Sequence, residues 1–455
     1  MQVLYNKPVR FTWPLFVQQI LDTFIANRFE IYVVGGAVRD LLLDYPVKDW
    51  DFTTNARPEQ ILKLFPQAFY DNHFGTVGLA HPPDPIYEIT TFRRDFNYLD
   101  HRRPSKIEWG QKLEDDLSRR DFTINAMALK PAGELIDLFA GQKDLQNKII
   151  RAVGQPQDRF QEDALRMLRA VRIATQLTFS IEKRTLASIK DNASLITFIS
   201  AERIRDELLK FLASPQAADG YRLLQQTHLA AKILPEVENA FGVDQKSPRR
   251  HHLDDVGTHS LKALRFSQSS DPIVKLATLV HDIGKPATRQ VIKGITTFYN
   301  HETAGARLAK AIARRLHLSR RDTDRLYKLV RWHLFTVYEH QTDKAIRRFI
   351  KNVGAENLND ILHLRLADRL GSGAKITSWR LERFKQRLLE VQKQPFTITD
   401  LKVDGHDVMN LLKIPSGPQV GQILTALFTQ VETNPTLNTR DYLLTQIPLV
   451  ANQPK

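Results

Sequence analysis

Apolar residues follow two different spacings along the chain. Between Phe16 and Phe24 they recur at intervals of three and four residues, which predicts a helix near the start. Residues 29–34 then form a short apolar run that ends at Gly35, a pattern typical of a buried strand leading into a glycine turn and a helix. From residue 159 to 234 the helical spacing is almost unbroken. The pattern therefore predicts an α+β first region followed by helical regions.

Breaks in this pattern divide the chain into four units. Two more strands are expected at 76–79 and 86–91, and the polar, charged segment 93–112 is expected to be mobile. The first unit closes near Gly154, and residues 244–250 form a linker. The predicted units are a head at 1–154, a helical neck at 155–240, a histidine-containing body at 241–392 and a C-terminal tail at 393–455.

The amino-acid composition indicates which kind of partner the protein binds and which residues can hold a metal. The chain has 455 residues, and its 65 Lys and Arg against 51 Asp and Glu leave a net charge of +14, which suits a polyanion such as nucleic acid or anionic lipid. Without cysteine, any metal must be held by His, Asp or Glu. Neither a secretion signal nor a run of eighteen apolar residues is seen, so we expect a soluble cytoplasmic protein without a membrane partner.

A pair of carboxylates lies shortly after the glycine turn. If Asp49 and Asp51 share a strand, they face the same side while Trp50 turns into the core. Such a pair suits Mg²⁺, which prefers oxygen ligands and bridges carboxylates to substrate phosphates. The alternative is a solvated strand edge, because Asp-x-Asp is a common sequence.

The turn itself favours the metal site. Gly35 and Gly36 lack a Cβ atom, so their backbone amides can approach a triphosphate at the start of a helix whose dipole attracts anions. Arg39, within that helix, could add a phosphate contact.

These residues resemble motif A of the class II tRNA nucleotidyltransferase and poly(A) polymerase family. Four further motifs of that family are matched in order, at residues 117–127, 135–151, 159–172 and 201–208. The resemblance covers about the first half of the chain. It implies a polymerase-beta-like nucleotidyltransferase head, with a small mixed sheet and helices, followed by an all-helical neck, body and tail.

The resemblance also implies individual roles. It supports Glu88 as a third catalytic carboxylate beside Asp49 and Asp51, on a strand where Glu88 faces opposite to its apolar neighbours; a surface glutamate is the alternative. In the second motif, the resemblance implies that Arg119, Arg120, Asp121 and Asn125 contact the nucleotide. The alternative for one or two of them is a purely structural role in a buried network of Arg with Asp. The nucleotide-binding residues it implies, besides Gly35, Gly36 and Arg39, are Arg119, Arg120, Asp121, Asn125, Asp163, Arg166, Arg169 and Arg172.

Asp163 and Arg166 are the candidates for nucleotide selection. They lie three apart on a predicted helix and so share a face. Cytosine and adenine both offer an amino donor beside a ring-nitrogen acceptor, so one acceptor and one donor can read both bases. The resemblance implies that this pair selects CTP and ATP without a nucleic-acid template. Outside the motif, such a pair is usually a surface ion pair worth roughly a few tenths of a kcal/mol.

The segment 98–104 resembles the flexible loop of enzymes that add the terminal adenosine. Its presence argues against an enzyme restricted to the two cytidines. Without the resemblance it is a basic surface loop.

A second constellation combines imidazoles and carboxylates, which suit a divalent transition metal. These residues stand in the order His259, His281, Asp282, His301, His333 and Asp368. The order resembles an HD phosphohydrolase domain, which implies phosphodiesterase or phosphatase activity. A degenerate domain kept as an RNA-binding body is the alternative. His251, His252, His317, His340 and His363 show no such pattern. The implied ligands are His259, His281, Asp282 and Asp368, with His301 and His333 placed for a second ion.

The expected function is addition of C, C and A from CTP and ATP to the 3′ end of tRNA, with Mg²⁺ in the head and a transition metal of unassigned identity in the body. An A-adding enzyme or a poly(A) polymerase of the same family is the first alternative. A metal phosphohydrolase whose head only binds RNA is the second. The tail, at 403–421, resembles that of the same family and is expected to pack on the body and help bind RNA.

Overall fold

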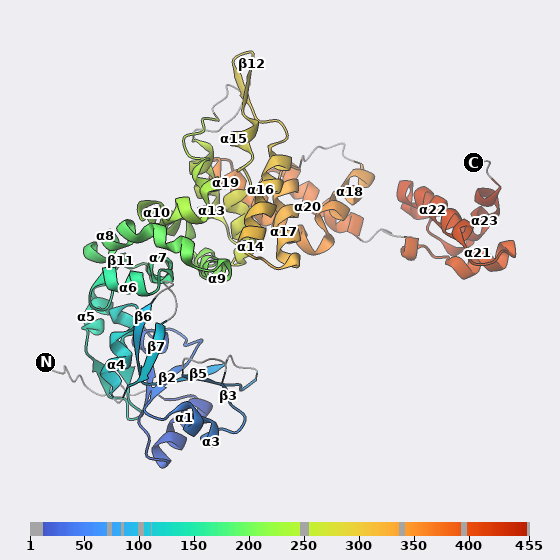
Figure 1. Cartoon of the computed structure of the whole chain (residues 1–455). Coiled ribbons are helices and arrows are strands. Elements are labelled where there is room, and N and C mark those ends of the chain that lie inside the picture. The colour runs from blue at the N-terminus through green and yellow to red at the C-terminus, as the bar shows by residue number, and fades with distance from the viewer. Residues whose placement is uncertain are drawn as a thin grey trace.

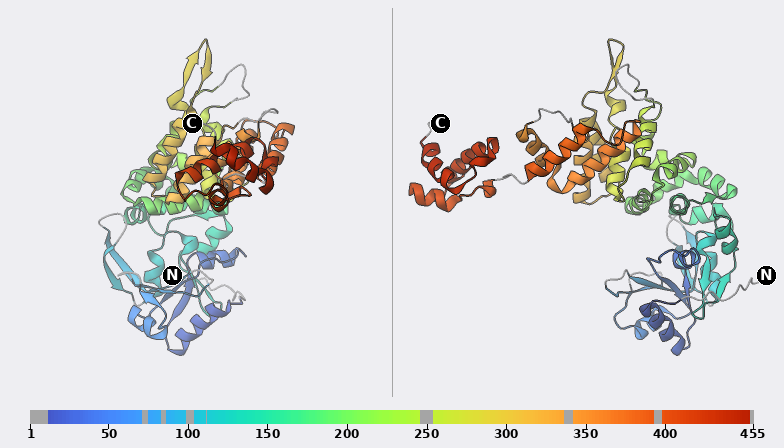
Figure 2. Two further views of the ribbon diagram at one scale, coloured as in Figure 1. Left: turned by 90° about the vertical axis from the view of Figure 1, so that its right-hand side faces the viewer. Right: turned by 180° about the vertical axis from the view of Figure 1, so that it is seen from behind.

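The computed structural model describes residues 12–70, 75–82, 86–98, 104–110, 112–245, 254–335, 342–392 and 398–452. Figure 1 shows an elongated, curved molecule with the sheet of the head at one end and the helices of the tail at the other. The views in Figure 2 show the helical body between them. Among the described residues, no helix is both long enough and apolar enough to cross a membrane.

The head is built on a seven-stranded sheet in the order β3-β4-β5-β2-β1-β8-β9. Strands β2 and β5 run parallel, whereas the other neighbouring pairs are antiparallel. This confirms the predicted α+β class and its small mixed sheet. The strands are β1 (Ile31–Val34), β2 (Asp51–Thr54), β3 (Phe69–Tyr70), β4 (Thr76–Leu79), β5 (Tyr87–Thr91), β8 (Met127–Leu129) and β9 (Leu135–Asp137).

Helix α1 (Leu15–Ala26) is the helix that the spacing near the start of the chain predicts. Val17, Ile20, Leu21 and Phe24 form its buried stripe and belong to the apolar core of the sheet. The remaining helices of the head are α2 (Gly36–Leu42), α3 (Pro58–Leu64), α4 (Leu113–Ser118), η1 (Thr123–Asn125) and α5 (Gly141–Gln146).

The segment 93–112, which the sequence marks as polar, charged and mobile, contains two strands. Strands β6 (Arg93–Tyr98) and β7 (Pro104–Trp109) form an antiparallel pair in which Arg93 lies opposite Trp109. Aromatic or β-branched residues alternate with polar ones at 95–98 and 106–109, and the high charge of the segment obscured this strand signal. The centre of the predicted flexible loop, residues 99–103, lies outside the described residues.

The neck and body share one continuous apolar core, which extends from Phe122 in the head to Val391. Two short strand pairs interrupt the helices that the sequence predicts: β10 (Ile149–Ile150) with β11 (Ser180–Ile181), and β12 (Gln290–Ile292) with β13 (Ile295–Thr297). The neck helices are α6 (Pro156–Glu162), α7 (Leu165–Leu177), α8 (Lys183–Asn192), η2 (Ala193–Phe198), α9 (Ala201–Leu212), α10 (Ala217–Gln226), α11 (Leu229–Ile233) and α12 (Pro235–Glu238).

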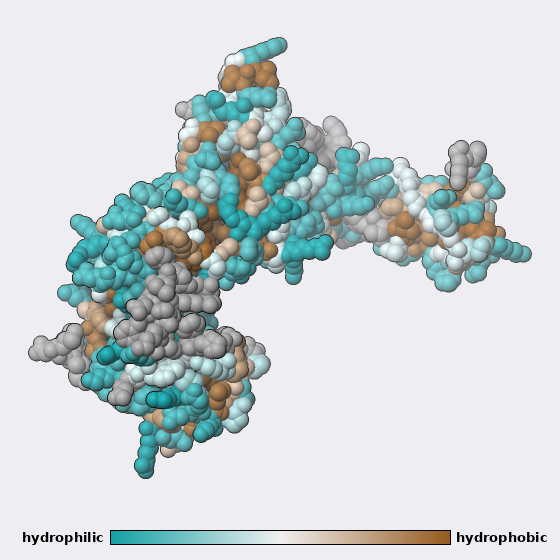
Figure 3. Space-filling view, viewed as in Figure 1, coloured by the Kyte–Doolittle hydropathy of each residue, from teal (hydrophilic) through white to brown (hydrophobic). Residues whose placement is uncertain are grey.

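Helices of the body pack with apolar faces inward, and Figure 3 shows mostly hydrophilic residues on the outside of α16 and α17. The hairpin of β12 and β13 projects from this body (Figure 1). The body helices are α13 (Val256–Phe266), α14 (Pro272–Val280), α15 (Lys285–Thr288), α16 (His301–Arg315), α17 (Arg320–Trp332), α18 (Asp343–Val353), η3 (Ala355–Asn357), α19 (Leu358–Gly371) and α20 (Trp379–Gln392).

The tail has a small core of its own, centred on Val408, Leu427 and Leu443. The tail meets the body where Arg347 on α18 donates to the carbonyl oxygen of Glu432 on the tail helix α22 (Pro418–Thr433). Residues of both helices border a cavity of about 1020 Å³. The elements of the tail are η4 (Ile398–Asp400), α21 (Gly405–Leu412), α22 (Pro418–Thr433), η5 (Pro435–Leu437) and α23 (Arg440–Ala451).

Candidate active site of the head and candidate metal centre of the body

The glycine turn between β1 and α2 brings three functional candidates together. Gly35 has φ of +75°, a conformation that other residues rarely adopt. A Cβ atom on Gly35 would lie 3.0 Å from Oδ2 of Asp51 and 3.1 Å from Nη1 of Arg120. The absent side chain therefore leaves the space in which the carboxylate and the guanidinium meet. Gly36 begins α2, and a Cβ atom there would lie 3.3 Å from Nη2 of Arg39.

Asp51 and Glu88 lie on neighbouring parallel strands. They are paired in register at the point where β2 begins. Glu88 is exposed between the buried Tyr87 and Ile89, the alternation expected from the sequence. The structure thus brings these two carboxylates to the same position across the sheet.

The expectation that Asp49 and Asp51 share a strand is wrong, because β2 begins only at Asp51. Asp49 lies in the exposed connection before it, whereas Trp50 is buried as expected. The backbone N–H of Glu88 still donates to the carbonyl oxygen of Trp50 at 3.3 Å, so the pairing with β5 ends just after Asp49 in the chain. The negative charge of Asp49 still acts on Asp51.

Burial raises the pKa of the Asp51 carboxyl from 3.8 to about 6. The charges of Glu88 and Asp49 raise it further, while Arg120 and Arg169 oppose them. A desolvated carboxylate beside two others is unfavourable when ionised, and a divalent cation removes that penalty. The charge environment of Asp51 therefore suits a nearby divalent cation.

Asp121 organises the residues next to this site. It is buried, and its Oδ2 accepts from Nε of Arg169 at 2.8 Å while its Oδ1 accepts from Nδ2 of Asn125 at 3.0 Å. Nη1 of Arg39 in turn donates to Oδ1 of Asn125 at 2.8 Å. Burial alone would raise the pKa of Asp121, but Arg169 and Asn125 hold it below the ordinary value. The network links the helix after the glycine turn to the neck.

Asp116 is a residue that the sequence reading missed. It is fully buried on α4, and its two oxygens bind the side chains of Arg119 and Arg120, three and four residues later. Together the two arginines hold the pKa of Asp116 below its ordinary value, against the effect of burial. The i,i+3 and i,i+4 spacing before an arginine pair was the available signal.

The prediction that Asp163 and Arg166 share a continuous helix is wrong. Asp163 has an extended conformation at the end of α6, and α7 begins at Leu165. Its side chain accepts from the backbone N–H of Leu165 at 3.1 Å, which caps the new helix. A short polar side chain favours such a break over helix continuation.

Asp163 and Arg166 are each held by other residues. Nη1 and Nη2 of Arg203 donate to the Asp163 carboxylate at 3.1 and 2.7 Å. Nη1 of Arg166 donates to Glu162 at 2.6 Å, and its Nη2 donates to the carbonyl oxygen of Arg119 at 2.8 Å. Arg203 lies in the fifth motif, but the sequence reading assigned it no role.

Arg172 does not reach the head network directly. Its Nε donates to Oε2 of Glu207, whose other oxygen lies 3.6 Å from Nη1 of Arg169. Glu207 is buried on α9 and was likewise missed. Arg172 thus supports Arg169 through a shared carboxylate.

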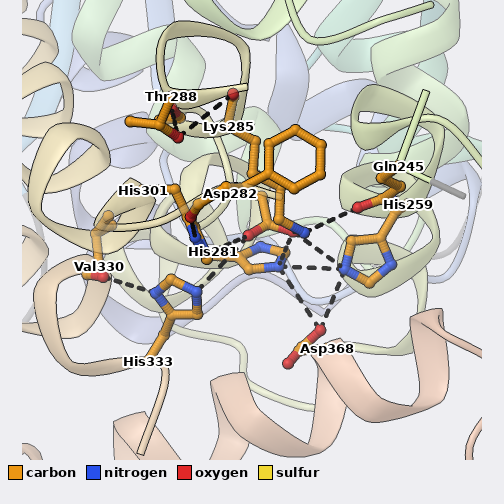
Figure 4. A network of polar contacts seen from close by, with 12 residues as sticks. Gln245, His259, His281, Asp282, Lys285, Thr288, His301, Val330, His333 and Asp368 are labelled. Atoms are coloured by element: carbon orange, nitrogen blue, oxygen red, sulfur yellow. Dashed lines mark hydrogen bonds and ion pairs between the residues drawn. The ribbon is translucent and has the colours of Figure 1, made fainter. Parts of the chain in front are cut away.

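In the body, six side chains converge from five segments (Figure 4). Asp282 joins two groups of potential metal ligands, His259–His281–Asp282 and Asp282–His301–His333. Its Oδ2 lies 3.5 Å from Nε2 of His259 and 3.2 Å from Nε2 of His281. Its Oδ1 lies 3.3 Å from Nε2 of His301 and 3.7 Å from Nε2 of His333.

Asp368, on α19, completes the first group. Its Oδ1 lies 3.1 Å from Nε2 of His259 and 3.8 Å from Nε2 of His281. Burial would raise the pKa of Asp368, but the two histidines hold it below the ordinary value. The carboxylate is therefore ionised and available as a ligand.

Backbone carbonyls set the orientation of three of these rings. Nδ1 of His281, His301 and His333 each lies 2.7 Å from the carbonyl oxygen three residues earlier. A carbonyl only accepts, so Nδ1 carries a proton in each ring, and Nε2 keeps its lone pair in the neutral form. Burial lowers the pKa of His281, but Asp282 and Asp368 outweigh this effect and raise it above the ordinary value. Nε2 of His301 and of His333 is buried with no hydrogen-bond partner within the described part of the chain. Burial lowers the pKa of His333 and keeps it neutral.

This centre fits divalent metal binding. Neutral imidazole nitrogens with a fixed tautomer and ionised carboxylates are the donor set that such ions take. Of the other histidines, His317 and His363 are exposed, while His251, His252 and His340 lie outside the described residues.

Family models match three consecutive parts of the chain. The poly(A) polymerase head domain matches residues 31–151, the probable RNA and SrmB-binding site of polymerase A matches 178–241, and the HD domain matches 227–371. Together they span most of the chain, in the order that the sequence motifs indicate. The chain belongs to the tRNA nucleotidyltransferase and poly(A) polymerase family.

Curated relatives within this family are named CCA-adding enzymes. The chain is 47% identical to the enzyme of Lactobacillus helveticus over 215 residues, which are 47% of this chain and 54% of the relative. It is 47% identical to that of Geobacillus thermodenitrificans over 206 residues, 45% of this chain and 51% of the relative. The chain thus matches about half the length of these relatives.

Solved structures of the family match over nearly the whole chain. The CCA-adding enzyme of Bacillus stearothermophilus in complex with CTP superposes with a TM-score of 0.70 at 27% identity, over 96% of this chain and 98% of that one. The Thermotoga maritima enzyme complexed with tRNA has a TM-score of 0.60 at 21% identity, over 99% of each chain, which supports the fold alone. The polymerase-type head and the helical remainder are thus the fold of this family.

Proposed function

We propose that this protein adds C, C and A to the 3′ end of tRNA, using CTP and ATP. The observation that supports it best is the register of Asp51 with Glu88 beside the Gly35 turn. The charge around the desolvated Asp51 carboxylate suits a metal, and Arg120 and Arg39, which lie against the two glycines, suit a triphosphate. In each step the tRNA 3′ oxygen bonds to the α-phosphorus of the nucleotide, and pyrophosphate leaves.

Asp49, Asp51 and Glu88 would hold Mg²⁺, which supplies activation of the attacking hydroxyl and charge neutralisation of the leaving phosphates. Asp51 is partly buried, whereas Asp49 and Glu88 are exposed. Arg120, held by Asp116, would contact the triphosphate next to the Gly35 and Gly36 amides, with Arg39 and Arg119 beside it.

Asp163 and Arg166 would read the base edge. Although Asp163 binds Arg203, a carboxylate has about four lone-pair sites, so it can still accept from an amino group of cytosine or adenine. Arg203 would keep the acceptor in place, and the Arg119 carbonyl would align Arg166. Asp121, Asn125, Arg169 and Arg172 would support this arrangement from the neck side.

Incorporation of labelled CTP and ATP tests the proposal. The acceptors are tRNAs that end before CCA, after one C and after CC, and an Asp49/Asp51 double Asn variant is the control. Addition of C, C and A followed by arrest supports a complete CCA-adding enzyme. Addition of A alone to the CC-ended tRNA indicates an A-adding enzyme, and long A tails indicate a poly(A) polymerase.

A second function, metal-dependent phosphoester hydrolysis, is supported by Asp282 between two ligand groups. His259, His281, Asp282 and Asp368 would hold one divalent transition metal, and His301 and His333 would help hold another. The metal would supply an activated water as nucleophile. A variant that lacks His281 and Asp282 should lose hydrolysis of 2′,3′-cyclic AMP but keep nucleotide incorporation. Loss of all activity in that variant, with the Asp49/Asp51 variant unaffected, would instead make hydrolysis the main activity.

The four units predicted from the sequence are kept as a proposal for the domain division: head 1–154, neck 155–240, body 241–392 and tail 393–455. The net charge of +14 supports contact of these units with tRNA phosphates. Affinity should then fall by about 0.7 log units per log unit of salt for each phosphate held on a single strand. A cytoplasmic location fits this substrate class.

A further inference from the structure

Lys285 lies buried next to the metal centre of the body. Its side chain is 6% exposed, and its Nζ donates to Oδ2 of Asp282 at 2.6 Å. Nζ also donates to Oε1 of Gln245 at 2.8 Å (Figure 4). The ring of Phe298 lies beneath it, with its centroid 5.7 Å from Nζ. The ammonium therefore donates to two acceptors, and its third N–H has no hydrogen-bond acceptor among the described residues.

Gln245 is the less expected of the two anchors. It precedes α13 in the connection from the neck, and it is 1% exposed. Because its Oε1 must accept from Lys285, its amide orientation is determined, and Nε2 points away from the ammonium. Nε2 is buried without a hydrogen-bond partner among the described residues. A buried amide donor without an acceptor is unfavourable, so an apolar side chain would suit a purely structural position better.

We propose that Gln245 is a positioning residue of the body's hydrolytic site: it holds the Lys285 ammonium beside Asp282 and, with it, presents N–H donors to an anionic oxygen of a phosphate ester. The inference rests on the proposed hydrolytic function. A phosphate ester brings to this site the acceptor oxygens that the two donors lack.

The position of Lys285 matters because Asp282 serves both groups of ligands. Lys285 binds the Oδ2 side, where His259 and His281 converge, and leaves Oδ1 directed at His301 and His333. Without Gln245, the ammonium keeps one anchor of two and gains freedom to leave the phosphate-binding position. Substrate and product affinity should therefore weaken more than metal affinity.

The test uses the full-length protein loaded with Mn²⁺. Gln245→Leu removes both the acceptor for Lys285 and the N–H donor, whereas Gln245→Glu keeps the acceptor and loses the donor. Gln290→Leu is the control, at an exposed glutamine of the same body. Three quantities are measured for each protein: bound metal per chain, the dissociation constant of inorganic phosphate by calorimetry, and kcat and KM for 2′,3′-cyclic AMP.

We expect Gln245→Leu and Gln245→Glu to weaken phosphate binding and to raise KM by about tenfold, with metal content and kcat much less affected. The control should match the wild type. Unchanged phosphate affinity in Gln245→Leu would overturn the inference, and so would a loss of metal that accounts for the whole effect. A wild-type protein that binds no metal and hydrolyses nothing would instead overturn the proposed hydrolytic function, and the inference with it.

Discussion

Replacement of Asp51 by Asn should stabilise the metal-free protein while it abolishes nucleotide incorporation. Burial raises the pKa of Asp51 from 3.8 to about 6, so the folded protein carries an ionised carboxylate that the unfolded chain solvates better. Asparagine has nearly the same shape and no charge. The substitution therefore removes a penalty on the folded state together with a proposed metal ligand.

The magnitude follows from linkage between proton binding and folding. A folded-state pKa above the unfolded value destabilises the protein at every pH where the group is ionised in the unfolded chain. The penalty is fully present above pH 6, where it amounts to about 3 kcal/mol, because one pKa unit corresponds to about 1.36 kcal/mol. It shrinks to about 1.6 kcal/mol at pH 5 and vanishes below pH 3.8.

Urea unfolding of the wild type and of Asp51→Asn measures this difference. Both proteins are unfolded in EDTA near pH 7.5 and again near pH 5, and Asp49→Asn serves as the control at an exposed carboxylate. We expect the larger gain in unfolding free energy at the higher pH and little change in the control. Equal stability of Asp51→Asn and wild type at both values would refute the reasoning that Asp51 is a desolvated, charged group.

Three further predictions address the other sites. Gly35→Ala should abolish nucleotide incorporation, because the new Cβ atom would lie 3.0 Å from Oδ2 of Asp51 at a φ of +75°. Gly154→Ala is the control and should affect only stability, because Gly154 has a similar φ of +69° but no atom within 4 Å of the Cβ position. Equal activity of the two variants would contradict this prediction. Asp116→Asn should raise KM for CTP and ATP by about tenfold because two arginines lose their shared anion, and steady-state kinetics showing an unchanged KM would exclude that role. His333→Ala should lower metal stoichiometry from two ions per chain toward one, which elemental analysis of the full-length protein measures; two ions retained would remove His333 as a ligand.

Local patterns correctly predicted those parts of the molecule whose conformation depends on residues close by in the chain. The apolar stripe of α1 and the alternation around Glu88 were both read correctly, because helix and strand periodicity act over a few residues. Where polar residues compete with that periodicity, the reading was wrong. Asp163 breaks the helix by capping α7, and the charged strands β6 and β7 read as a loop.

Residue identity and order alone also indicated a nucleotide-transfer site in the head and a metal centre in the body. Imidazoles and carboxylates in the body, and carboxylates after a glycine turn in the head, are informative because few residue types bind metals and phosphates. What the spacing could not predict is the set of supporting partners. Asp116, Arg203, Glu207 and Gln245 carry ordinary polar side chains whose significance depends on where they are buried.

The sequence by itself determined the α+β head, the helical remainder, the family and the residue types that form each candidate site. Only the tertiary structure decided that Asp51 faces Glu88 across two strands and that Asp282 stands between two ligand groups. The physical reason is that periodicity and capping are local, whereas desolvation and ion pairing depend on residues brought together from distant segments. A carboxyl pKa of about 6 at Asp51 is a property of that assembly and of no single stretch of chain.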